Sequence, residues 1–280
     1  MITIAITGAS GAVGRALRPE LLKLGYALWL LDRVTPASIS AGETFHPVDI
    51  LQRQALASAL AGCDAVLHLA SCTVDDPDWS AHLSLSVEGT LSVFEACRDA
   101  GVSRVVYASS HHVVGLYPRQ PAVDVGLFHR PDSRYAAGKA VGETLGSLYA
   151  YKFGLSVLVI RIGNADPQPQ DRRRLGNWVA MADLAQLVDI GVKSEALTFE
   201  IVYGVSDTTG NTYDNGNAYR LGYRPVGRPM DYRSQVLAAD PAPAEGSTEA
   251  RSPAELTVGG MFSQREYVGL TDRLLPRGDA

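Results

Sequence analysis

A continuous apolar segment that runs directly into three regularly spaced glycines is the feature that most constrains the fold of this chain. Residues 2–7, ITIAIT, are typical of a buried strand, and the segment TGASGAVGR that follows places glycines at 8, 11 and 14. Gly8 allows a tight turn after the strand, Gly11 lets the backbone approach a pyrophosphate, and Gly14 allows close packing of the following helix. The N-terminus of that helix would then hold the phosphates. The pattern predicts a first strand–helix–strand unit that binds a dinucleotide.

Most of the chain repeats this alternation of apolar runs and helical spacing. The apolar residues of the runs are continuous instead of alternating, which is typical of strands buried on both faces of a parallel sheet. Strands are expected at residues 2–7, 27–32, 65–70, 104–109, 156–162 and 198–204, and helices at 13–24, 51–60, 83–100, 135–153 and 181–190. The predicted fold class is therefore α/β, a doubly wound parallel sheet (Rossmann fold) with right-handed crossovers and a small C-terminal substrate-binding cap.

The regular alternation ends after Gly163. The loop-rich segment NADPQPQDRRRLGN follows, and residues 240–253 are rich in proline. We therefore expect residues 1–163 to form the dinucleotide-binding core, including its catalytic residues. Residues 164–280 are expected to form a small mixed substrate-binding region that is interleaved with the last strands of the core.

The composition limits the classes of partner. The 280 residues are 46% hydrophobic and carry a formal net charge of −5, so nucleic acid and anionic membrane surfaces are not expected as partners. No apolar stretch approaches the roughly 20 residues that span a bilayer, and the first residues lack a signal-peptide pattern, so a cytoplasmic protein is expected. Three scattered cysteines, at 63, 72 and 97, have no CxxC spacing and are expected to be buried free thiols.

Asp32, at the end of the second expected strand, predicts which dinucleotide is bound. Its carboxylate would accept both ribose hydroxyls of the adenosine half and repel a 2′-phosphate, so NAD is favoured over NADP. Arg33 opposes this preference, because its guanidinium could neutralise a 2′-phosphate. Asp49 and Ile50 follow the expected third strand and fit a contact with the adenine amino group. Asp49 could equally be the N-cap of a helix that begins at Leu51.

A tyrosine and a lysine four residues apart indicate proton-transfer chemistry. Tyr135 and Lys139 in SRYAAGKAVGE share one face of an expected helix, and a lysine ammonium lowers the pKa of a nearby phenol, which makes a proton acceptor. Ser110 lies at the end of an expected central strand, ahead of both residues in the chain. As a set, these residues and the glycine motif resemble the extended branch of the short-chain dehydrogenase/reductase superfamily, whose fingerprint is TGxxGxxG with Tyr-x-x-x-Lys.

Within that branch the chain is most similar to the uronate dehydrogenases, and the resemblance covers essentially its whole length. The segments that carry it are SSHHVVGLYP (109–118), RPDSRYAAGK (130–139), VIRIG (159–163), the loop that ends in Arg173, and YDN (213–215) before LGYRP. The resemblance implies an enzyme that oxidises the anomeric carbon of a hexuronate, such as galacturonate or glucuronate, to an aldarolactone and passes hydride to NAD.

The same resemblance implies roles for individual residues. Tyr135 would be the base, Ser110 would align the reacting C1 oxygen, and Lys139 would bind the nicotinamide ribose. Arg173 would bind the substrate carboxylate. The sugar would be lined by Thr73, His111, His112 and Asn164.

The chain also departs from the family pattern. The family typically has Asn where His111 stands, Ser where Asn164 stands and Asn where Ser86 stands, so the identity of the sugar is less constrained than the chemistry. The superfamily implies a homo-oligomer, and long amphipathic helices at 83–100 and 135–153 would suit its interface.

Two serines followed by two histidines, SSHH at 109–112, leave three chemistries to compare. A metal site needs more ligands than two adjacent histidines, and neighbours at the end of an extended strand are expected to point to opposite sides. A Ser/His nucleophile pair would need an orienting acid and an oxyanion hole. A metal-free pocket that binds a hydroxylated substrate is therefore favoured. His112 is the better candidate to bind a sugar hydroxyl, and His111 could be an ordinary loop residue.

Other interpretations stay open at this point. Residues 172–174, RRR, could be a solvated charge run. An aldose or sugar-phosphate 1-dehydrogenase would use the same catalytic residues, with an arginine on the phosphate. A nucleotide-sugar epimerase or dehydratase shares the fold but binds its nucleotide through a larger C-terminal domain. A non-enzymatic NAD sensor would usually lack the catalytic tyrosine.

Overall fold

Seven parallel strands form the centre of the computed structural model, which describes residues 1–73, 78–120, 122–207 and 212–275. The strand order across the sheet is β3-β2-β1-β4-β5-β6-β7. The strands are β1 Thr3–Thr7, β2 Ala27–Asp32, β3 Glu43–Pro47, β4 Ala65–His68, β5 Arg104–Ser110, β6 Ser156–Ile162 and β7 Phe199–Gly204. The strand order reverses between β1 and β4, which is where ligands bind in doubly wound sheets. The expected α/β class and the expected strands are confirmed.

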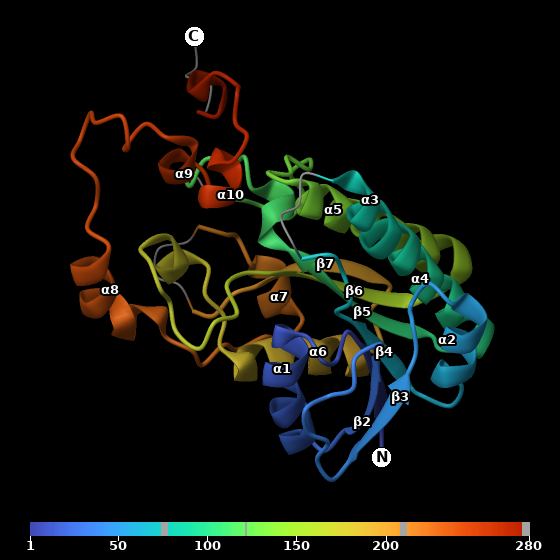
Figure 1. The fold of residues 1–280 in the computed structure, drawn as a ribbon. Coiled ribbons are helices and arrows are strands. Elements are labelled where there is room, and N and C mark those ends of the chain that lie inside the picture. The colour runs from blue at the N-terminus through green and yellow to red at the C-terminus, as the bar shows by residue number, and fades with distance from the viewer. Residues whose placement is uncertain (74–77, 121, 208–211, 276–280) are drawn as a thin grey trace.

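Helices cover both faces of the sheet (Figure 1). One face is packed by α1 (Ala12–Lys23) and α6 (Met181–Lys193), whose leucines share a core with β1 and β2. The other face is packed by α2 (Arg53–Leu60), α4 (Gly89–Ala100) and α5 (Arg134–Phe153). Because both faces are covered, the central strands are apolar along their length, which explains the continuous apolar runs in the sequence.

The helix expected at 83–100 has a more complex form. It begins as α3 (Trp79–Ala81), continues as a π-helix, η1 (His82–Glu88), and only then becomes α4. η1 lies against α5 where Gly138 leaves room for Ser86: a β-carbon on Gly138 would lie 2.7 Å from the Ser86 β-carbon. The prediction of one regular helix is therefore wrong, because this close approach is a tertiary contact that helical spacing does not encode.

A region of short helices follows Gly163, beside the carboxyl ends of the strands (Figure 1). These helices are η3 Arg173–Gly176, α7 Gly216–Arg220, η4 Pro229–Tyr232, α8 Arg233–Ala239, α9 Pro253–Leu256, α10 Met261–Gln264 and η5 Thr271–Arg273. The segment between α9 and α10 pairs with the loop after β5: the Val258 N–H donates to Tyr117 O at 3.0 Å and the Gly259 N–H to Gly115 O at 2.9 Å. α6 and β7 also follow Gly163 but belong to the sheet layers. A domain boundary at Gly163 stays a prediction.

The apolar content of the described helices and the burial of the described cysteines are those of an ordinary globular protein. None of the described helices has the length and apolar content needed to cross a membrane. Cys63, Cys72 and Cys97 are buried thiols that form no disulfide among the described residues, as expected. Burial raises the pKa of Cys63 to about 12, so this thiol stays protonated and unreactive near neutral pH.

Candidate active site

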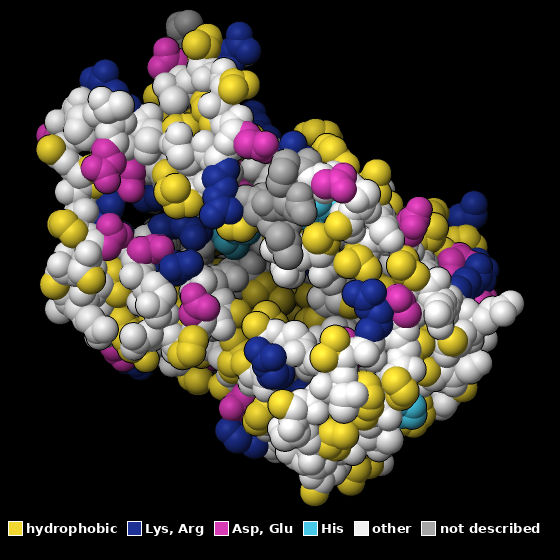
Figure 2. All heavy atoms as spheres, viewed as in Figure 1, with side chains coloured by type: hydrophobic (Ala, Val, Ile, Leu, Met, Phe, Trp, Pro, Cys, Tyr) yellow, Lys and Arg dark blue, Asp and Glu magenta, His cyan; other side chains and the backbone are white. Residues whose placement is uncertain are grey.

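A pocket at the carboxyl ends of β1, β2 and β4 collects the residues expected to bind a dinucleotide. Its volume is about 520 Å³. Its lining includes Gly8, Gly11, Gly14, Asp32, Asp49, Ile50 and Thr73. Figure 2 shows this face of the molecule hollowed, with hydrophobic side chains on the floor of the hollow and Lys and Arg side chains gathered beside it. The residues that the glycine motif and the strand ends predicted are thus neighbours in the fold.

The glycine turn after β1 allows close backbone contact. Gly8 has φ +71°, and a β-carbon there would lie 2.7 Å from Ala70 N. A β-carbon at Gly14 would lie 2.7 Å from Ala9 O, so any other residue would push α1 away from the turn. Gly11 is the N-cap of α1 and has no side chain that could cap it. The first N–H groups of α1 are therefore left for a ligand, and this geometry suits a pyrophosphate.

Asp32 is held in place at the end of β2, and Arg33 beside it has its own partner. The Asp32 carboxylate accepts backbone N–H groups from Ser10 at 2.9 Å and Val34 at 3.0 Å. The Arg33 guanidinium lies 3.6 Å from the carboxylate of Asp49. The Arg33 side chain is 61% exposed, so this contact is weak and Arg33 stays available to a 2′-phosphate.

Asp49 holds the turn before α2 without being the N-cap of that helix. α2 begins at Arg53 after the N-cap residue Gln52. The Asp49 carboxylate instead accepts the Leu51 N–H at 3.0 Å. The N-cap alternative for Asp49 is therefore wrong, and a contact of Asp49 and Ile50 with adenine stays a prediction.

Ser110, Tyr135 and Lys139 come together where β5 ends and α5 begins. Ser110 is the last residue of β5, and the side chain of Ser133 caps α5, which places Tyr135 in the first turn of the helix. Lys139 is buried one turn further on, and its Nζ donates to Ala108 O at 2.6 Å. The same Nζ lies 5.9 Å from the centre of the Tyr135 ring. The expected trio is thus one cluster at the carboxyl end of a central strand.

Burial has the largest effect on ionisation in this cluster. It raises the pKa of Tyr135, a hydrogen bond with Ser110 lowers that pKa, and the carboxylate of Asp132 raises it further. Burial also lowers the pKa of Lys139 to about 7. The expected net lowering of the Tyr135 pKa by Lys139 is therefore wrong for the protein alone. The Ser110 hydroxyl is the neighbour that favours the phenolate.

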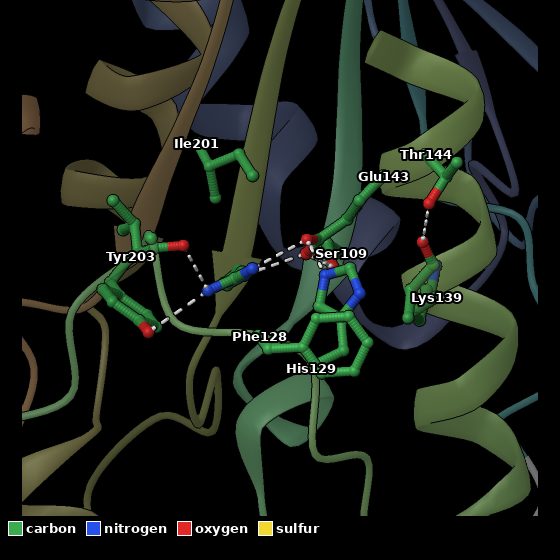
Figure 3. Close-up of polar contacts among 12 residues, drawn as sticks. Ser109, Phe128, His129, Lys139, Glu143, Thr144, Ile201 and Tyr203 are labelled. Atoms are coloured by element: carbon green, nitrogen blue, oxygen red, sulfur yellow. Dashed lines mark hydrogen bonds and ion pairs between the residues drawn. The ribbon is translucent and has the colours of Figure 1, made fainter. Parts of the chain in front are cut away.

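Beyond Lys139, Glu143 anchors α5 to its surroundings, as Figure 3 shows. Its buried carboxylate accepts hydrogen bonds from Ser109 Oγ at 2.5 Å and from His129 Nε2 at 2.8 Å. Ser109 directly precedes Ser110 on β5, and His129 lies in the loop before α5. Glu143 therefore connects β5 and α5, the two elements that carry the catalytic cluster, with the loop before α5.

His111 and His112 begin a short 3-10 helix, η2 (His111–Val114), directly after Ser110. The Ser110 side chain caps this turn by accepting the His112 N–H at 3.3 Å. The two histidine ring centroids are 4.0 Å apart. The expectation that the rings point to opposite sides is wrong, because the serine cap turns the chain from a strand into a helix at that residue.

His111 has protein partners on both ring nitrogens. Its Nδ1 lies 3.0 Å from the Tyr213 hydroxyl, and its Nε2 lies 3.4 Å from Asn177 Nδ2. Burial lowers the pKa of His111 well below its usual value, and its neighbours His112, Arg173 and Arg174 add to this effect, so the ring is neutral. A contact of His111 with a sugar stays a prediction. No sequence pattern indicated Asn177, whereas Tyr213 belongs to the YDN segment that carried the family resemblance.

His112 keeps one ring nitrogen free of hydrogen bonds within the described part of the chain. Its Nδ1 lies 2.6 Å from Asp132 Oδ2. The ring of Phe262 in α10 packs on it at a centroid distance of 4.3 Å, and the Tyr135 ring meets it in an edge-on arrangement at a centroid distance of 6.3 Å. Sequence reasoning missed Asp132 and Phe262. Asp132 stands three residues before Tyr135, which is a usable signal, but no local pattern indicates Phe262.

Arg173 differs from its two neighbours in the RRR run. Arg172 and Arg174 each form an ion pair with a nearby acid, at 3.1 and 3.2 Å respectively. Arg173 has no carboxylate partner among the described residues, and its Nη1 donates to the backbone O of Val258 at 3.3 Å. All three arginines are half-buried, which does not fit the alternative of a solvated charge run.

Arg173 lines a second cavity, with a volume of about 300 Å³. Asn177 and Tyr213, the two partners of His111, line the same cavity. Asn164, just after β6, donates its backbone N–H to Asn177 O at 2.8 Å, and its Oδ1 is buried without a hydrogen-bond partner. Arg173, Asn164 and His111 therefore belong to one region, whereas Thr73 lies in the dinucleotide pocket. Binding of a sugar by these residues stays a prediction.

The described residues contain no group of three or more His, Cys, Asp or Glu side chains that could hold a metal ion. The Nδ1 of His112 is already occupied by Asp132, and both ring nitrogens of His111 have partners. The absence of a metal from the reaction stays a prediction.

Known proteins resemble this chain over nearly its whole length. The NAD dependent epimerase/dehydratase family matches residues 4–192. Uronate dehydrogenase of Pseudomonas syringae pv. tomato is 34% identical over 259 residues, which are 92% of this chain and 91% of that protein. NAD-dependent glucose-6-phosphate dehydrogenase of Haloferax volcanii is 32% identical over 85% of this chain and 98% of that protein.

A solved structure extends the likeness to the fold. The crystal structure of glucuronic acid dehydrogenase from Chromohalobacter salexigens matches with a TM-score of 0.87 at 34% identity, over 94% of this chain and 96% of that chain. With this coverage, the match extends past Gly163 into the region of short helices. The glycine turn, the Ser110, Tyr135 and Lys139 cluster and this likeness agree, and the chain belongs to the NAD-dependent epimerase/dehydratase family, among the uronate dehydrogenases.

Proposed function

We propose that this chain is an NAD-dependent dehydrogenase that oxidises the anomeric carbon of a hexuronic acid, galacturonate or glucuronate, to the aldarolactone. Arg173 carries the proposal: it is a half-buried guanidinium without a carboxylate partner among the described residues, and it lines the same cavity as Asn177 and Tyr213, the two partners of His111. A sugar acid supplies both the missing negative charge and the hydroxyl groups that the neighbouring polar residues would bind. The relatives named uronate dehydrogenase support this substrate class.

The pocket beside the catalytic cluster fits NAD. Gly8 and Gly14 stand where a β-carbon would collide with the backbone, and the uncapped start of α1 suits a pyrophosphate. Asp32 would accept the adenosine ribose hydroxyls, and Lys139 would bind the nicotinamide ribose. When bound, NAD supplies the hydride acceptor for the sugar carbon.

Tyr135 and Ser110 would carry out the proton transfer of the reaction. Oxidation of the C1 hydroxyl to a carbonyl removes one hydride and one proton, so a base must face the C1 oxygen. Ser110 would hold that oxygen, and the phenolate of Tyr135 would accept its proton. Because burial raises the Tyr135 pKa, the phenolate needs the Ser110 hydrogen bond and a nearby cation such as Lys139.

The polar residues around this cluster would hold the rest of the sugar. Arg173 would form a two-pronged pair with the C6 carboxylate, the geometry in which a guanidinium binds carboxylates best. His112 and Asn164 would bind ring hydroxyls, and His111 would support them through Tyr213 and Asn177. Thr73 would bind a hydroxyl of the sugar from the dinucleotide pocket that it lines.

A substrate panel tests the proposal. Purified protein is incubated with NAD and, in turn, galacturonate, glucuronate, the neutral aldoses galactose and glucose, and glucose 6-phosphate, with and without a chelator. We expect NAD reduction with the uronates at a kcat/KM well above that of the aldoses, unaffected by chelator. Activity that disappears in chelator and returns with zinc would contradict the metal-free mechanism, and activity with neutral aldoses alone would contradict the uronate substrate.

A sugar-phosphate 1-dehydrogenase is the second candidate. The Haloferax relative named glucose-6-phosphate dehydrogenase favours it, since it matches 85% of this chain. Arg173 could bind a phosphate as well as a carboxylate. In the same panel, a preference for glucose 6-phosphate over every uronate would select this alternative.

We further propose that the enzyme is a homo-oligomer. α4 and α5 carry exposed apolar side chains, namely Leu91, Val141, Leu148, Tyr151 and Phe153. Single exposed apolar residues are common, but a group on two adjacent helices is typical of an interface. Sedimentation of the purified protein at the mass of one chain would contradict this expectation.

A further inference from the structure

Asp132 is held on several sides beside the sugar region, although it touches none of the catalytic trio through a hydrogen bond. Its Oδ2 lies 2.6 Å from His112 Nδ1, and its Oδ1 accepts the Ser133 hydroxyl at 3.0 Å. Its side chain is 0% exposed. A β-carbon on Gly115 or Gly259 would lie 1.9 or 2.0 Å from Oδ2, so two glycines make the room that the carboxylate fills.

This carboxylate determines which nitrogen of His112 carries a proton. An ionised carboxylate only accepts hydrogen bonds, so Nδ1 of His112 is the donor, and in the neutral ring Nε2 is then an acceptor. The neighbouring rings of His111 and Phe262, at centroid distances of 4.0 and 4.3 Å, restrict rotation of the imidazole. Within the described part of the chain, no hydrogen bond is made by Nε2.

We propose that Asp132 is a positioning residue that fixes His112 as a hydrogen-bond acceptor and thereby makes the site select a sugar hydroxyl that donates to Nε2. The inference rests on the proposed function, because it takes the ligand to be a sugar acid. A substrate without that hydroxyl leaves a fixed, largely buried acceptor unpaired. Such a site rejects analogues more strongly than a flexible one, since the unpaired group cannot find another donor.

A purely structural role for Asp132 makes a different prediction. Asp132 immediately precedes Ser133, the N-cap of α5, so its loss could simply loosen the start of the catalytic helix. That effect would lower stability and kcat for every substrate alike. It would change neither the protonated nitrogen of His112 nor the ratio between substrates that differ in one hydroxyl.

The first measurement is the tautomer of His112, which needs no substrate. Protein with ¹⁵N-labelled histidine is saturated with NAD and studied by NMR, and the His112→Gln variant assigns the signals among the 6 histidines. We expect the proton on Nδ1 in the parent, loss of that preference in Asp132→Ala, and retention of it in Ser133→Ala. The Ser133 variant is the matched control, since it weakens the start of α5 but keeps the Asp132–His112 contact. A proton on Nε2 in the parent would overturn the proposal.

The second measurement is discrimination between sugars. The probes are galacturonate and its deoxyfluoro analogues at C2, C3 and C4, because fluorine is close to a hydroxyl in size but donates no hydrogen bond. We expect the parent and Ser133→Ala to disfavour one analogue by roughly 10- to 100-fold in kcat/KM. Asp132→Ala should raise KM for galacturonate by about tenfold, with a smaller change in kcat, and should lose most of that discrimination. The electronic effect of fluorine is common to all variants and cancels in the comparison.

The two measurements separate failure of this inference from failure of the proposed function. Unchanged discrimination in Asp132→Ala would overturn the role of Asp132 even if the parent oxidises uronates. If the parent oxidises no uronate, the proposed function fails, and the NMR measurement still decides whether Asp132 fixes the His112 tautomer.

Discussion

The carboxylate of Glu143 and the guanidinium of Arg161 form a two-pronged ion pair in the protein interior, with contacts of 2.9 and 2.8 Å. Their side chains are 2% and 1% exposed. Figure 3 shows Glu143 reaching from α5 toward Ser109 and His129, with Tyr203 on the opposite side of the cluster. Because Arg161 lies on β6, the pair joins the catalytic helix to the sheet.

Replacing Glu143 by Gln should destabilise the fold strongly. The buried Arg161 would lose its compensating charge, and we expect the free energy of unfolding to fall by about 3–5 kcal/mol, measured by urea denaturation at neutral pH. His129→Gln is the matched control, because it removes a more exposed partner of the same carboxylate and should cost about 1 kcal/mol or less. Equal losses in the two variants would mean that Arg161 does not depend on Glu143.

Tyr135→Phe tests the proposed base. The ring keeps its packing, but no atom remains to accept the proton, so kcat with galacturonate should fall roughly 10²-fold or more. NAD binding, followed by fluorescence titration, should stay nearly unchanged. Turnover within a few-fold of the parent would assign the base to another residue.

The pH dependence tests the role of Ser110. Its hydrogen bond lowers the Tyr135 pKa, so Ser110→Ala should raise that pKa. A base works only when deprotonated, and activity is lost as the pH falls through its pKa. The acidic limb of the kcat profile should therefore move to higher pH in the variant. Ser109→Ala removes the neighbouring hydroxyl, which donates to Glu143, and should leave the limb in place. A limb at the parent position in Ser110→Ala would show that Tyr135 ionises independently of Ser110.

Asp32→Asn tests the cofactor preference. The substitution keeps the size of the side chain but removes the charge that repels a 2′-phosphate. Arg33 is the next residue in the chain and could then pair with that phosphate. We expect the ratio of kcat/KM for NADP to that for NAD to rise roughly tenfold or more, about 1.4 kcal/mol. Adding Arg33→Ala should reverse part of the gain. An unchanged ratio in Asp32→Asn would place the discrimination elsewhere in the pocket.

Local patterns were sufficient to predict the parts of this fold that depend on neighbouring residues. The central strands are apolar on both faces, the turn at Gly8 needs a positive φ, and Tyr135 and Lys139 share one helix face. Each of these properties can be read within a few residues of the chain. Ser110 was grouped with Tyr135 through the resemblance to the short-chain dehydrogenase/reductase superfamily, since no local pattern places the end of a strand beside the start of a later helix.

Contacts between distant segments could not be predicted in the same way. Phe262 reaches His112 from α10, and Asn177 reaches His111 from the segment after η3. The π-helix η1 packs closely against α5, where Ser86 approaches Gly138, and this contact joins residues 52 positions apart in the chain. The rise in the Tyr135 pKa could not be predicted either, because it depends on burial, and burial is a property of the whole fold.

Arg173→Ala decides the substrate. If the guanidinium pairs with the C6 carboxylate, its loss should cost about 2–5 kcal/mol, a fall of roughly 30- to several-thousand-fold in kcat/KM for galacturonate. Galactose has no carboxylate, so its kcat/KM should fall much less. The ratio of kcat/KM for galacturonate to that for galactose should therefore fall strongly. Arg173→Lys should restore only part of it, since an ammonium cannot form the planar two-pronged pair.

The RRR run itself offers the control for this last experiment. Arg174 is adjacent in sequence and half-buried, but its guanidinium is paired with Asp171 at 3.2 Å. Arg174→Ala removes the same charge from the same 3-10 turn, so it should lower the stability of η3 while keeping the preference for galacturonate over galactose. If both variants shift the ratio equally, the effect belongs to the general positive charge of the loop. If neither does, the carboxylate is bound elsewhere and a neutral or phosphorylated sugar becomes the better substrate.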